Sequence, residues 1–170
     1  MNIRSIHERM NFILFFYKHE YYNKNPSNCQ EMILNEKKLC YNNFGDDKME
    51  CTFCKILNEE IPSYTVYEDE KVKAFLDINP DVNGHILIIP KKHYTDIVDI
   101  DNQTLSHIFD VARYLKSLLE TKLQIDGLTF IQNNGDVQEV KHFHLHLKPY
   151  YREEQVLLPV EDIYEKLKES

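Results

Sequence analysis

Apolar and histidine side chains alternate strictly along residues 140–149, near the end of the chain. The two interleaved sets are Phe143, Leu145 and Leu147 on one side and His142, His144 and His146 on the other. Because every second residue of a β-strand lies on the same face, this alternation predicts a strand. Its apolar face would pack on a core, and its other face would hold three imidazoles over a cleft.

A helical period replaces this alternation between residues 101 and 123, where apolar side chains recur every three or four positions. The recurring residues are Leu105, Ile108, Phe109, Ala112, Leu115 and Leu119. They form one face of an amphipathic helix, which we expect to pack on the core. Asp101 precedes the first turn and is a good N-cap, because its carboxylate can accept from a free backbone N–H.

Shorter apolar runs, bounded by turn residues, predict the remaining elements. Strands are expected at residues 64–67, 72–75, 86–89 and 128–132, and helical segments at residues 51–61 and 160–168. Together with the histidine strand, these elements predict an α+β domain. Its sheet would be mostly antiparallel with about five strands, and it would carry one long helix.

Charge and composition divide the chain into two parts. The first 49 residues hold seven Lys and Arg against six Asp and Glu, whereas the remaining residues hold thirteen against twenty-two. We interpret residues 1–48 as a weakly ordered N-terminal extension, and residues 49–170 as the folded domain with a C-terminal tail. An acidic domain without a basic block argues against nucleic acid as a partner, while a small phosphorylated ligand stays open.

No apolar run approaches the ~18 residues that span a bilayer, so no membrane partner is expected. The short apolar segment at residues 12–17 runs into Lys18 without a small-residue cleavage site, which argues against a secretory signal. We therefore expect a cytoplasmic or nuclear location, or both. Organelle targeting by residues 1–48 stays open as an alternative.

Three imidazoles on one strand indicate chemistry near neutral pH, as nucleophile, proton carrier or metal ligand. Isolated histidines are more often ordinary surface or core residues, which is how we interpret His7, His19 and His107. From the residues alone, a three-histidine metal site therefore competes with a catalytic set.

Four cysteines add a second candidate centre. Cys51 and Cys54 form a C-x-x-C pair, which indicates a metal site or redox chemistry, whereas Cys29 and Cys40 have no recognisable spacing. The redox alternative is the weaker one, because the βαβ context that follows a thioredoxin-like motif is missing.

The order of several segments closely resembles the histidine triad (HIT) family of nucleotide hydrolases and transferases. The segments are CTFCKI at 51–56, EIPS at 60–63, VYED at 66–69, AFLDINP at 74–80, GHILIIPKKH at 84–93, QNNG at 132–135 and QEV at 138–140, then the three histidines. The resemblance covers about residues 51–152. Each segment is weak alone, but the ordered set is highly specific.

This resemblance implies a HIT-like fold that forms a homodimer, in which two protomers share a continuous sheet. It implies a catalytic set in which His144 attacks the α-phosphorus of a nucleotide conjugate and forms a covalent nucleotidyl-histidine. A backbone carbonyl next to the third histidine would accept from the other N–H of His144. His146 would contact the phosphate and the leaving group, and His142 and His85 would support the active histidines.

The family's nucleotide-binding positions can also be carried over. The base would lie against Phe53, Ile56, Phe75 and Ile78. Asp77 would accept both ribose hydroxyls, Asn133 would contact the phosphate or the leaving group, and Gln138 is assigned to the same site. For the apolar residues, ordinary core packing is the competing interpretation.

In one branch of the family, the C-x-x-C pair joins two histidines in a metal site. The equivalent residues here are Cys51, Cys54, His93 and His142. Such a closed Cys₂His₂ set suits tetrahedral structural zinc, which would stabilise the protein rather than catalyse. His142 would then link the metal to the neighbouring nucleophile.

Two features depart from the family pattern beside the phosphates. The loop between Gly135 and Gln138 holds only Asp136 and Val137, and is therefore shorter and more acidic than usual. Glu139 occupies a position where some members carry a serine that donates to the substrate, and a carboxylate cannot donate unless protonated. We expect these changes to alter the rate or the leaving-group preference.

The sequence therefore predicts a zinc-stabilised, homodimeric hydrolase that cleaves purine nucleoside 5′-phosphoramidates or similar conjugates of nucleoside monophosphates. A dinucleoside polyphosphate hydrolase is the alternative within the enzyme class. A non-catalytic interaction protein that binds zinc and nucleotide is the alternative outside it, because a fold and a site do not prove turnover.

Overall fold

The computed structural model describes residues 29–34, 37–42 and 51–168 of the 170-residue chain. The chain divides into two compact units, Met1–Asp46 and Asp47–Ser170. In the first unit, β1 (Cys29–Leu34) pairs antiparallel with β2 (Lys37–Asn42). The predicted weak order of residues 1–48 concerns residues that mostly lie outside the described ones, and it stays a prediction.

A five-stranded antiparallel sheet forms the centre of the second unit, in the order β3-β4-β5-β7-β6. Its strands are β3 (Thr65–Glu68), β4 (Val72–Leu76), β5 (Ile86–Pro90), β6 (Gly127–Ile131) and β7 (Leu145–Tyr150). The α+β class and the five antiparallel strands are thus confirmed. The two outer strands, β3 and β6, each leave one edge unpaired within the described unit.

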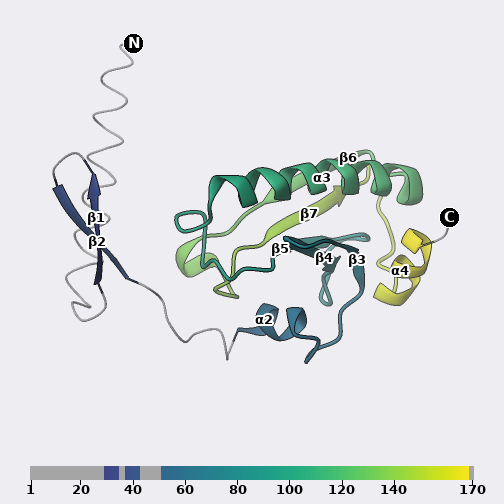
Figure 1. Ribbon diagram of the computed structural model, residues 1–170. Coiled ribbons are helices and arrows are strands. Elements are labelled where there is room, and N and C mark those ends of the chain that lie inside the picture. The colour runs from purple at the N-terminus through teal and green to yellow at the C-terminus, as the bar shows by residue number, and fades with distance from the viewer. Residues whose placement is uncertain (1–28, 35–36, 43–50, 169–170) are drawn as a thin grey trace, which may run out of the picture. The chain divides into compact units, whose positions relative to one another are not determined.

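The long helix α3 (Asn102–Leu123) covers one face of this sheet (Figure 1). Asp101 is its N-cap, as predicted, and accepts from the backbone N–H of Thr104 at 2.9 Å. The helix buries Ile108, Val111, Ala112, Leu115 and Leu119 in the main core. Among the described helices, none combines the length and the apolar character that a membrane crossing requires.

The opposite face of the sheet carries the short helix α2 (Thr52–Leu57) (Figure 1). Alternate residues of β4 serve the two faces, since Ala74 belongs to the main core and Phe75 to a second cluster under α2. That cluster also contains Phe53 and Ile56 of α2. Strands β4 and β5 are therefore buried on both faces, and the α2 side is the one that receives the predicted site residues.

Helix α4 (Val160–Lys168) closes the domain beside β3. Its Ile163 and Leu167 join the main core, and the ring of Tyr164 packs at 5.3 Å from the ring of Tyr64. The hydroxyl of Tyr64 also donates to Glu161. The C-terminal segment thus holds the first edge of the sheet and leaves the second edge, β6, uncovered by it.

The turn before β5 is built on Gly84, which has a positive φ of 81°. A Cβ atom at this position would lie 2.6 Å from Cδ1 of Leu123 and 3.1 Å from Cδ2 of Leu119. Glycine therefore lets the turn approach the end of α3, in a backbone conformation that other residues adopt at a cost. The turn delivers His85 to the start of β5, beside β7.

The histidine segment differs from its prediction in one respect, because β7 begins at Leu145 and leaves His142 and His144 in irregular backbone. The backbone N–H of Phe143 donates to the carbonyl of Tyr94 at 2.6 Å instead of entering a strand ladder. The apolar side of the alternation is nevertheless buried as predicted, with Phe143, Leu145 and Leu147 in the main core. The turn before β7 therefore keeps the apolar side chains on the core side, although residues 142–144 are not part of a strand.

Two of the three imidazoles are less exposed than the strand pattern predicts. His142 and His144 are buried, with exposed fractions of 0% and 4%. The ring of Phe53 packs edge to face against both, at 5.9 Å from the ring of His142 and 5.1 Å from that of His144. Helix α2 therefore contributes to the burial of these two imidazoles.

Candidate active site and metal centre

Four segments bring the candidate residues together on the α2 side of the sheet. The segment before β7 and β7 itself supply His142, His144 and His146, and the start of β5 supplies His85. His93 follows β5, and Cys51 and Cys54 lie at the N-cap and in the first turn of α2. These residues form two adjoining centres, one of imidazoles alone and one of thiols and imidazoles.

The side chain of His144 is fixed by the backbone two residues before it. Its Nδ1 lies 2.7 Å from the carbonyl oxygen of His142, which can only accept, so Nδ1 carries the proton. The neutral ring then has its lone pair at Nε2. Burial lowers the pKa of His144, which favours this neutral form, while the hydrogen bond to His142 opposes that change.

The acceptor of this hydrogen bond differs from the one expected from the resemblance. The carbonyl next to the third histidine was predicted, and the structure uses the carbonyl of the first, His142. The reason is the turn before β7, in which that carbonyl is not engaged in the sheet ladder and faces the ring two residues later.

His146 and His85 form a second imidazole pair across β7 and β5. Nδ1 of His146 lies 2.9 Å from Nε2 of His85, so one nitrogen donates and the other accepts. Burial lowers the pKa of His146 to about 4, with further lowering by the neighbouring imidazoles and Lys148. Burial also lowers the pKa of His85, against the opposing effect of Asp77 and Asp81. Without substrate, the pair is therefore neutral at neutral pH.

The ligand atoms of Cys51, Cys54, His93 and His142 all lie within 4.8 Å of one another. Sγ of Cys51 is 3.5 Å from Nδ1 of His142, and Sγ of Cys54 is 3.3 Å from Nδ1 of His93. Around a tetrahedral zinc ion, sulfur and nitrogen donors would be about 3.6 Å apart, given the usual bond lengths. Both the donor types and their spacing therefore fit zinc.

The orientation of His142 agrees with a metal-binding role. Its Nε2 donates to the carbonyl of Pro90 at 2.9 Å, which leaves the lone pair at Nδ1, toward the two sulfurs. Burial lowers the pKa of His142 to about 4, so the ring is in the neutral form that a metal ligand requires. Such a carbonyl partner is the usual orienting contact of a ligating histidine.

The predicted base-binding residues occupy two environments. Phe53, Ile56 and Phe75 are buried in the cluster under α2, where the rings of Phe53 and Phe75 pack edge to face at 5.9 Å. Ile78, in contrast, is 67% exposed in the turn after β4. Core packing thus accounts for three of these side chains, while an exposed isoleucine next to the site has no such explanation.

The predicted polar contacts of the nucleotide come from three separate loops. Asp77 follows β4 and is half-buried, with Oδ1 accepting from the N–H of Asn79 at 3.0 Å and Oδ2 at 3.5 Å from Nδ1 of His85. Asn133 is half-buried in the loop after β6. Gln138 is buried and donates to the carbonyls of Thr95 and His142, so it supports the histidine segment directly.

Two charged residues beside the His85–His146 pair are missing from the sequence prediction. Lys148 lies two positions after His146 on β7, and its Nζ is 2.5 Å from Oδ2 of Asp81. Oδ1 of Asp81 is in turn 3.2 Å from Nδ1 of His85. Lys148 continues the two-residue alternation that carries the three histidines, so the sequence pattern could have indicated it. Nothing local marks Asp81 as its partner.

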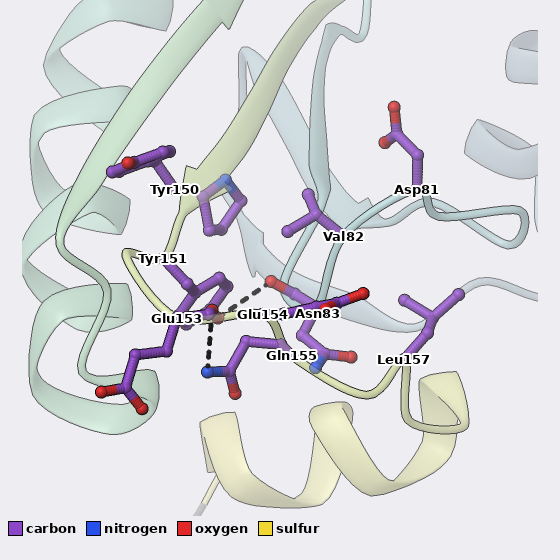
Figure 2. A pocket seen from close by; sticks show the side chains of 10 residues that line it. Asp81, Val82, Asn83, Tyr150, Tyr151, Glu153, Glu154, Gln155 and Leu157 are labelled. Atoms are coloured by element: carbon purple, nitrogen blue, oxygen red, sulfur yellow. Dashed lines mark hydrogen bonds between the residues drawn. The ribbon is translucent and has the colours of Figure 1, made fainter.

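A cavity of about 270 Å³ lies next to this ion pair, between the turn at residues 81–83 and the segment after β7. Figure 2 shows Asp81 at one edge and Tyr151 facing Asn83, whose carbonyl accepts from the Tyr151 hydroxyl at 3.1 Å. Its charged lining residues, Asp81, Glu153 and Glu154, are all acidic. The turn that carries Asp81 is therefore held from the far side by the C-terminal segment.

A model of the HIT domain family matches residues 58–153 of the chain. An uncharacterised HIT-like protein of Methanocaldococcus jannaschii is 47% identical over 103 residues, which cover 59% of this chain and 79% of that protein. The adenosine 5′-monophosphoramidase HNT1 of Saccharomyces cerevisiae is 40% identical over 110 residues, 64% of this chain and 67% of that protein.

Solved structures show the same fold. A zinc-bound histidine triad family protein from Mycobacterium smegmatis is similar with a TM-score of 0.65 and 30% identity, over 71% of this chain and 92% of that one. A Hit-like protein from Bartonella henselae is similar with a TM-score of 0.64 and 34% identity, over 69% of this chain and 94% of that one. The unit from residue 47 onward thus has the architecture of these proteins.

Proposed function

This chain belongs to the HIT domain family, and from that premise we propose that it hydrolyses purine nucleoside 5′-phosphoramidates or similar conjugates of nucleoside monophosphates. The yeast relative that is 40% identical is an adenosine 5′-monophosphoramidase, which supports a phosphoramidate as the substrate class. The proposal also rests on the chemistry that the buried imidazoles can perform.

The hydrogen bond from Nδ1 of His144 to the carbonyl of His142 is the observation that carries this proposal. It keeps the ring in the tautomer with a lone pair at Nε2, and burial keeps the ring neutral. A neutral imidazole nitrogen held in one orientation is a competent nucleophile for phosphorus. The neighbouring rings are engaged differently, since His85 and His146 pair with each other and Nε2 of His142 donates to the carbonyl of Pro90.

In the proposed reaction, the lone pair of His144 Nε2 forms a bond to the α-phosphorus while the P–N bond breaks. The electron pair of that bond leaves with the amine nitrogen, which takes a proton from the His85–His146 pair. That pair is protonated in the substrate complex, because the anionic phosphate raises the pKa of the neighbouring imidazoles. Water then attacks the nucleotidyl-histidine, releases the nucleoside monophosphate and returns a proton to the pair. Splitting one displacement into two easier ones is the advantage of the covalent route.

Nucleotide recognition would use the residues around Phe53. Asp77 is an acceptor suited to both ribose hydroxyls, and the exposed Ile78 is available to cover one face of the base. Asn133 would contact the phosphate or the leaving group. In this proposal, Gln138 contributes by holding the carbonyl of His142 rather than by touching the nucleotide.

Zinc would be held by Cys51, Cys54, His93 and His142, whose donor atoms fit it. When bound by four protein ligands, the ion has no position for a substrate, so its role would be structural. It would fasten the start of α2 to the segment before β7. That fastening would hold the ring of Phe53 over His142 and His144.

The free edge of β6 is the place where a second protomer would continue the sheet. Phe130 on β6 and Phe109 on α3 are 43% and 40% exposed, and their rings pack at 6.1 Å. An unpaired edge strand flanked by exposed aromatic rings is a typical self-association surface. We therefore propose a homodimer that pairs β6 with its copy.

The decisive experiment compares steady-state hydrolysis of adenosine 5′-phosphoramidate and of diadenosine polyphosphates by the wild type and His144→Ala. We expect turnover of the phosphoramidate, and a loss of at least about a thousandfold in the variant, because the nucleophile is removed. His107→Ala, which changes a histidine on α3, is the matched control and should keep wild-type activity.

Other outcomes of this experiment would replace the proposal. Preference for the polyphosphates would make the protein a dinucleoside polyphosphate hydrolase. Nucleotide binding without any turnover would make it a non-catalytic interaction protein. Turnover by His144→Ala at the wild-type rate would remove His144 as the nucleophile.

A further inference from the structure

The imidazole pair of His85 and His146 continues into a pair of charges. Nδ1 of His85, on the side away from His146, lies 3.2 Å from Oδ1 of Asp81 and 3.5 Å from Oδ2 of Asp77. The other oxygen of Asp81 contacts Nζ of Lys148 at 2.5 Å. One continuous path therefore runs from Lys148 through Asp81 and His85 to His146.

His85 is the buried member of this path, with an exposed fraction of 3%. Its Nδ1 forms no hydrogen bond within the described residues, although two carboxylates face it. The proton affinity of such a buried nitrogen depends on the electrostatic field of the carboxylates, because no hydrogen bond fixes its protonation. Its protonation is therefore set by the balance of nearby charges.

We propose that the Asp81–Lys148 ion pair controls the protonation of the coupled His85–His146 imidazoles, and so acts as a positioning pair for the proton that the leaving group takes. The catalytic part of this inference rests on the proposed hydrolase function. The electrostatic part concerns the protein alone and can be measured without turnover.

The directions of the two effects follow from the charges. The carboxylate of Asp81 stabilises a positive charge on the imidazole pair, whereas the ammonium of Lys148 opposes it. Lys148 also holds the pKa of Asp81 below its usual range, which keeps that carboxylate ionised. The two residues therefore act against each other, and their ion pair moderates the field at His85.

The remaining charged groups around the pair are few within the described residues. Asp77, after β4, faces His85 and also acts on His146, and His144 is the ring neighbour of His146 at 4.8 Å. We place Asp77 and His144 in the nucleotide and catalytic machinery. Asp81 and Lys148 are therefore the two groups that can be changed without removing a residue that contacts substrate.

The experiment is an NMR titration of the full-length protein with ¹⁵N-labelled histidine, in the wild type and in two charge variants. Asp81→Asn should lower the pKa of the His85–His146 pair by about half a unit, a small shift because the Asp81 side chain is 62% exposed. Lys148→Met should raise it by a similar amount. The double variant Asp81→Asn/Lys148→Met should titrate close to the wild type.

Kinetics of phosphoramidate hydrolysis supply the second measurement. Since the protonated pair serves as the acid, kcat should be high below its pKa and fall above it. This alkaline limb should move to lower pH in Asp81→Asn and to higher pH in Lys148→Met. On the falling limb, each change amounts to about threefold in rate.

Matched controls separate these shifts from general effects of charge. Asp110→Asn and Lys116→Met make the same chemical changes on the exposed face of α3, where both residues pair within the helix. They should leave the titration and the pH profile unchanged. A merely structural role of Asp81 and Lys148 would instead lower activity in both variants without moving the limb in opposite directions.

Two outcomes would overturn the inference: shifts of the same sign in the two single variants, or no shift in either. Opposite NMR shifts in a protein that turns over no substrate would support the electrostatic control and reject the hydrolase proposal. Opposite NMR shifts with an unmoved alkaline limb would reject the pair as the proton donor. Each proposal can therefore fail separately.

Discussion

At the scale of single residues, several side chains in this protein form hydrogen bonds with two structural elements at once. Asp69 is the clearest case outside the site. One of its oxygens accepts from the backbone N–H groups of Lys71 and Val72, both at 2.8 Å. The other lies 2.9 Å from the Tyr67 hydroxyl and 2.6 Å from Nε2 of His107. The carboxylate thus ties the β3–β4 turn to α3.

We predict a pH-dependent loss of stability in Asp69→Asn. Burial would raise the pKa of Asp69, but the hydrogen bonds from Val72, Lys71, His107 and Tyr67 together lower it to about 2. Because the folded-state pKa lies below the unfolded one, this carboxylate contributes stability above about pH 4 and loses it as the pH falls through 2. The variant should be less stable by about 1–3 kcal/mol at pH 7.

Calorimetric melting of both proteins between pH 2 and pH 7 tests this prediction. The difference in Tm should shrink toward zero at the acid end, where both side chains are uncharged. Asp110→Asn, on the exposed face of α3, serves as the control and should cost little at any pH. A difference that stays constant across the range would show that Asp69 contributes no linked protonation.

The sequence located most candidate side chains but not the bonds that orient them. The ordered motifs bring His144, the two cysteines and His93 into consideration, and the structure places them in two adjoining centres. The contact of Lys148 with Asp81 joins positions 67 residues apart, so it depends on how β7 lies beside the turn before β5. The carbonyl that orients His144 belongs to the backbone and has no signature in the sequence.

At the scale of elements, the regular pieces were predictable and the irregular ones were not. The period of α3 and the N-cap at Asp101 follow from residues that are neighbours in sequence, and α3 begins within one residue of the prediction. The late start of β7 has a different cause, since the N–H of Phe143 is bound by Tyr94 from a distant loop. Such tertiary competition overrides a perfect alternation.

Helix α2 is an element that cannot stand alone. It has six residues, fewer than an isolated helix needs in water, and the side chain of Cys51 makes no capping hydrogen bond. Its stability must therefore come from the cluster under it and from whatever joins its cysteines to His93 and His142. A metal ion at that junction would act on the whole site through α2.

We predict that the double variant Cys51→Ser/Cys54→Ser loses one zinc ion per chain, and that its Tm falls by about 5 °C or more. Metal content by inductively coupled plasma mass spectrometry and melting by circular dichroism measure the two effects. Hydrolysis below the lowered Tm should persist at a reduced rate, because His144 keeps its carbonyl partner.

The matched control for the metal is Cys29→Ser/Cys40→Ser, which makes the same change at the two cysteines of the first unit. It should retain zinc and Tm. Stoichiometric zinc in Cys51→Ser/Cys54→Ser would instead move the metal to the triad histidines, and would make the ion a competitor of the nucleotide.

At the scale of the whole molecule, the two edges of the sheet differ in how far neighbouring elements cover them. Edge β3 is covered by α4, whereas edge β6 carries the exposed Phe130 beside Phe109 of α3. A soluble protein usually protects such an edge with charge or with a partner. The asymmetry is the reason to expect association at β6 and not at β3.

We predict that Phe130→Lys converts a dimer into a monomer. Light scattering behind size exclusion should give about twice the chain mass of 20.4 kDa for the wild type and the single mass for the variant. Tyr114→Lys is the control, because this exposed ring lies on α3 but packs toward Tyr67 of β3. A wild type that elutes as a monomer at all concentrations, or a dimeric Phe130→Lys, would place the interface elsewhere or remove it.

His142 combines three contacts in one residue: Nδ1 faces the sulfurs, Nε2 donates to Pro90, and its carbonyl holds the His144 ring. The first two contacts belong to the side chain and disappear in any substitution, but the third survives every amino acid that preserves the local turn. A saturation mutagenesis library would therefore report the loss of the two side-chain contacts at position 142 and would not detect the hydrogen bond that orients His144. Only a change of the backbone itself, such as an amide-to-ester replacement, would expose what that carbonyl contributes.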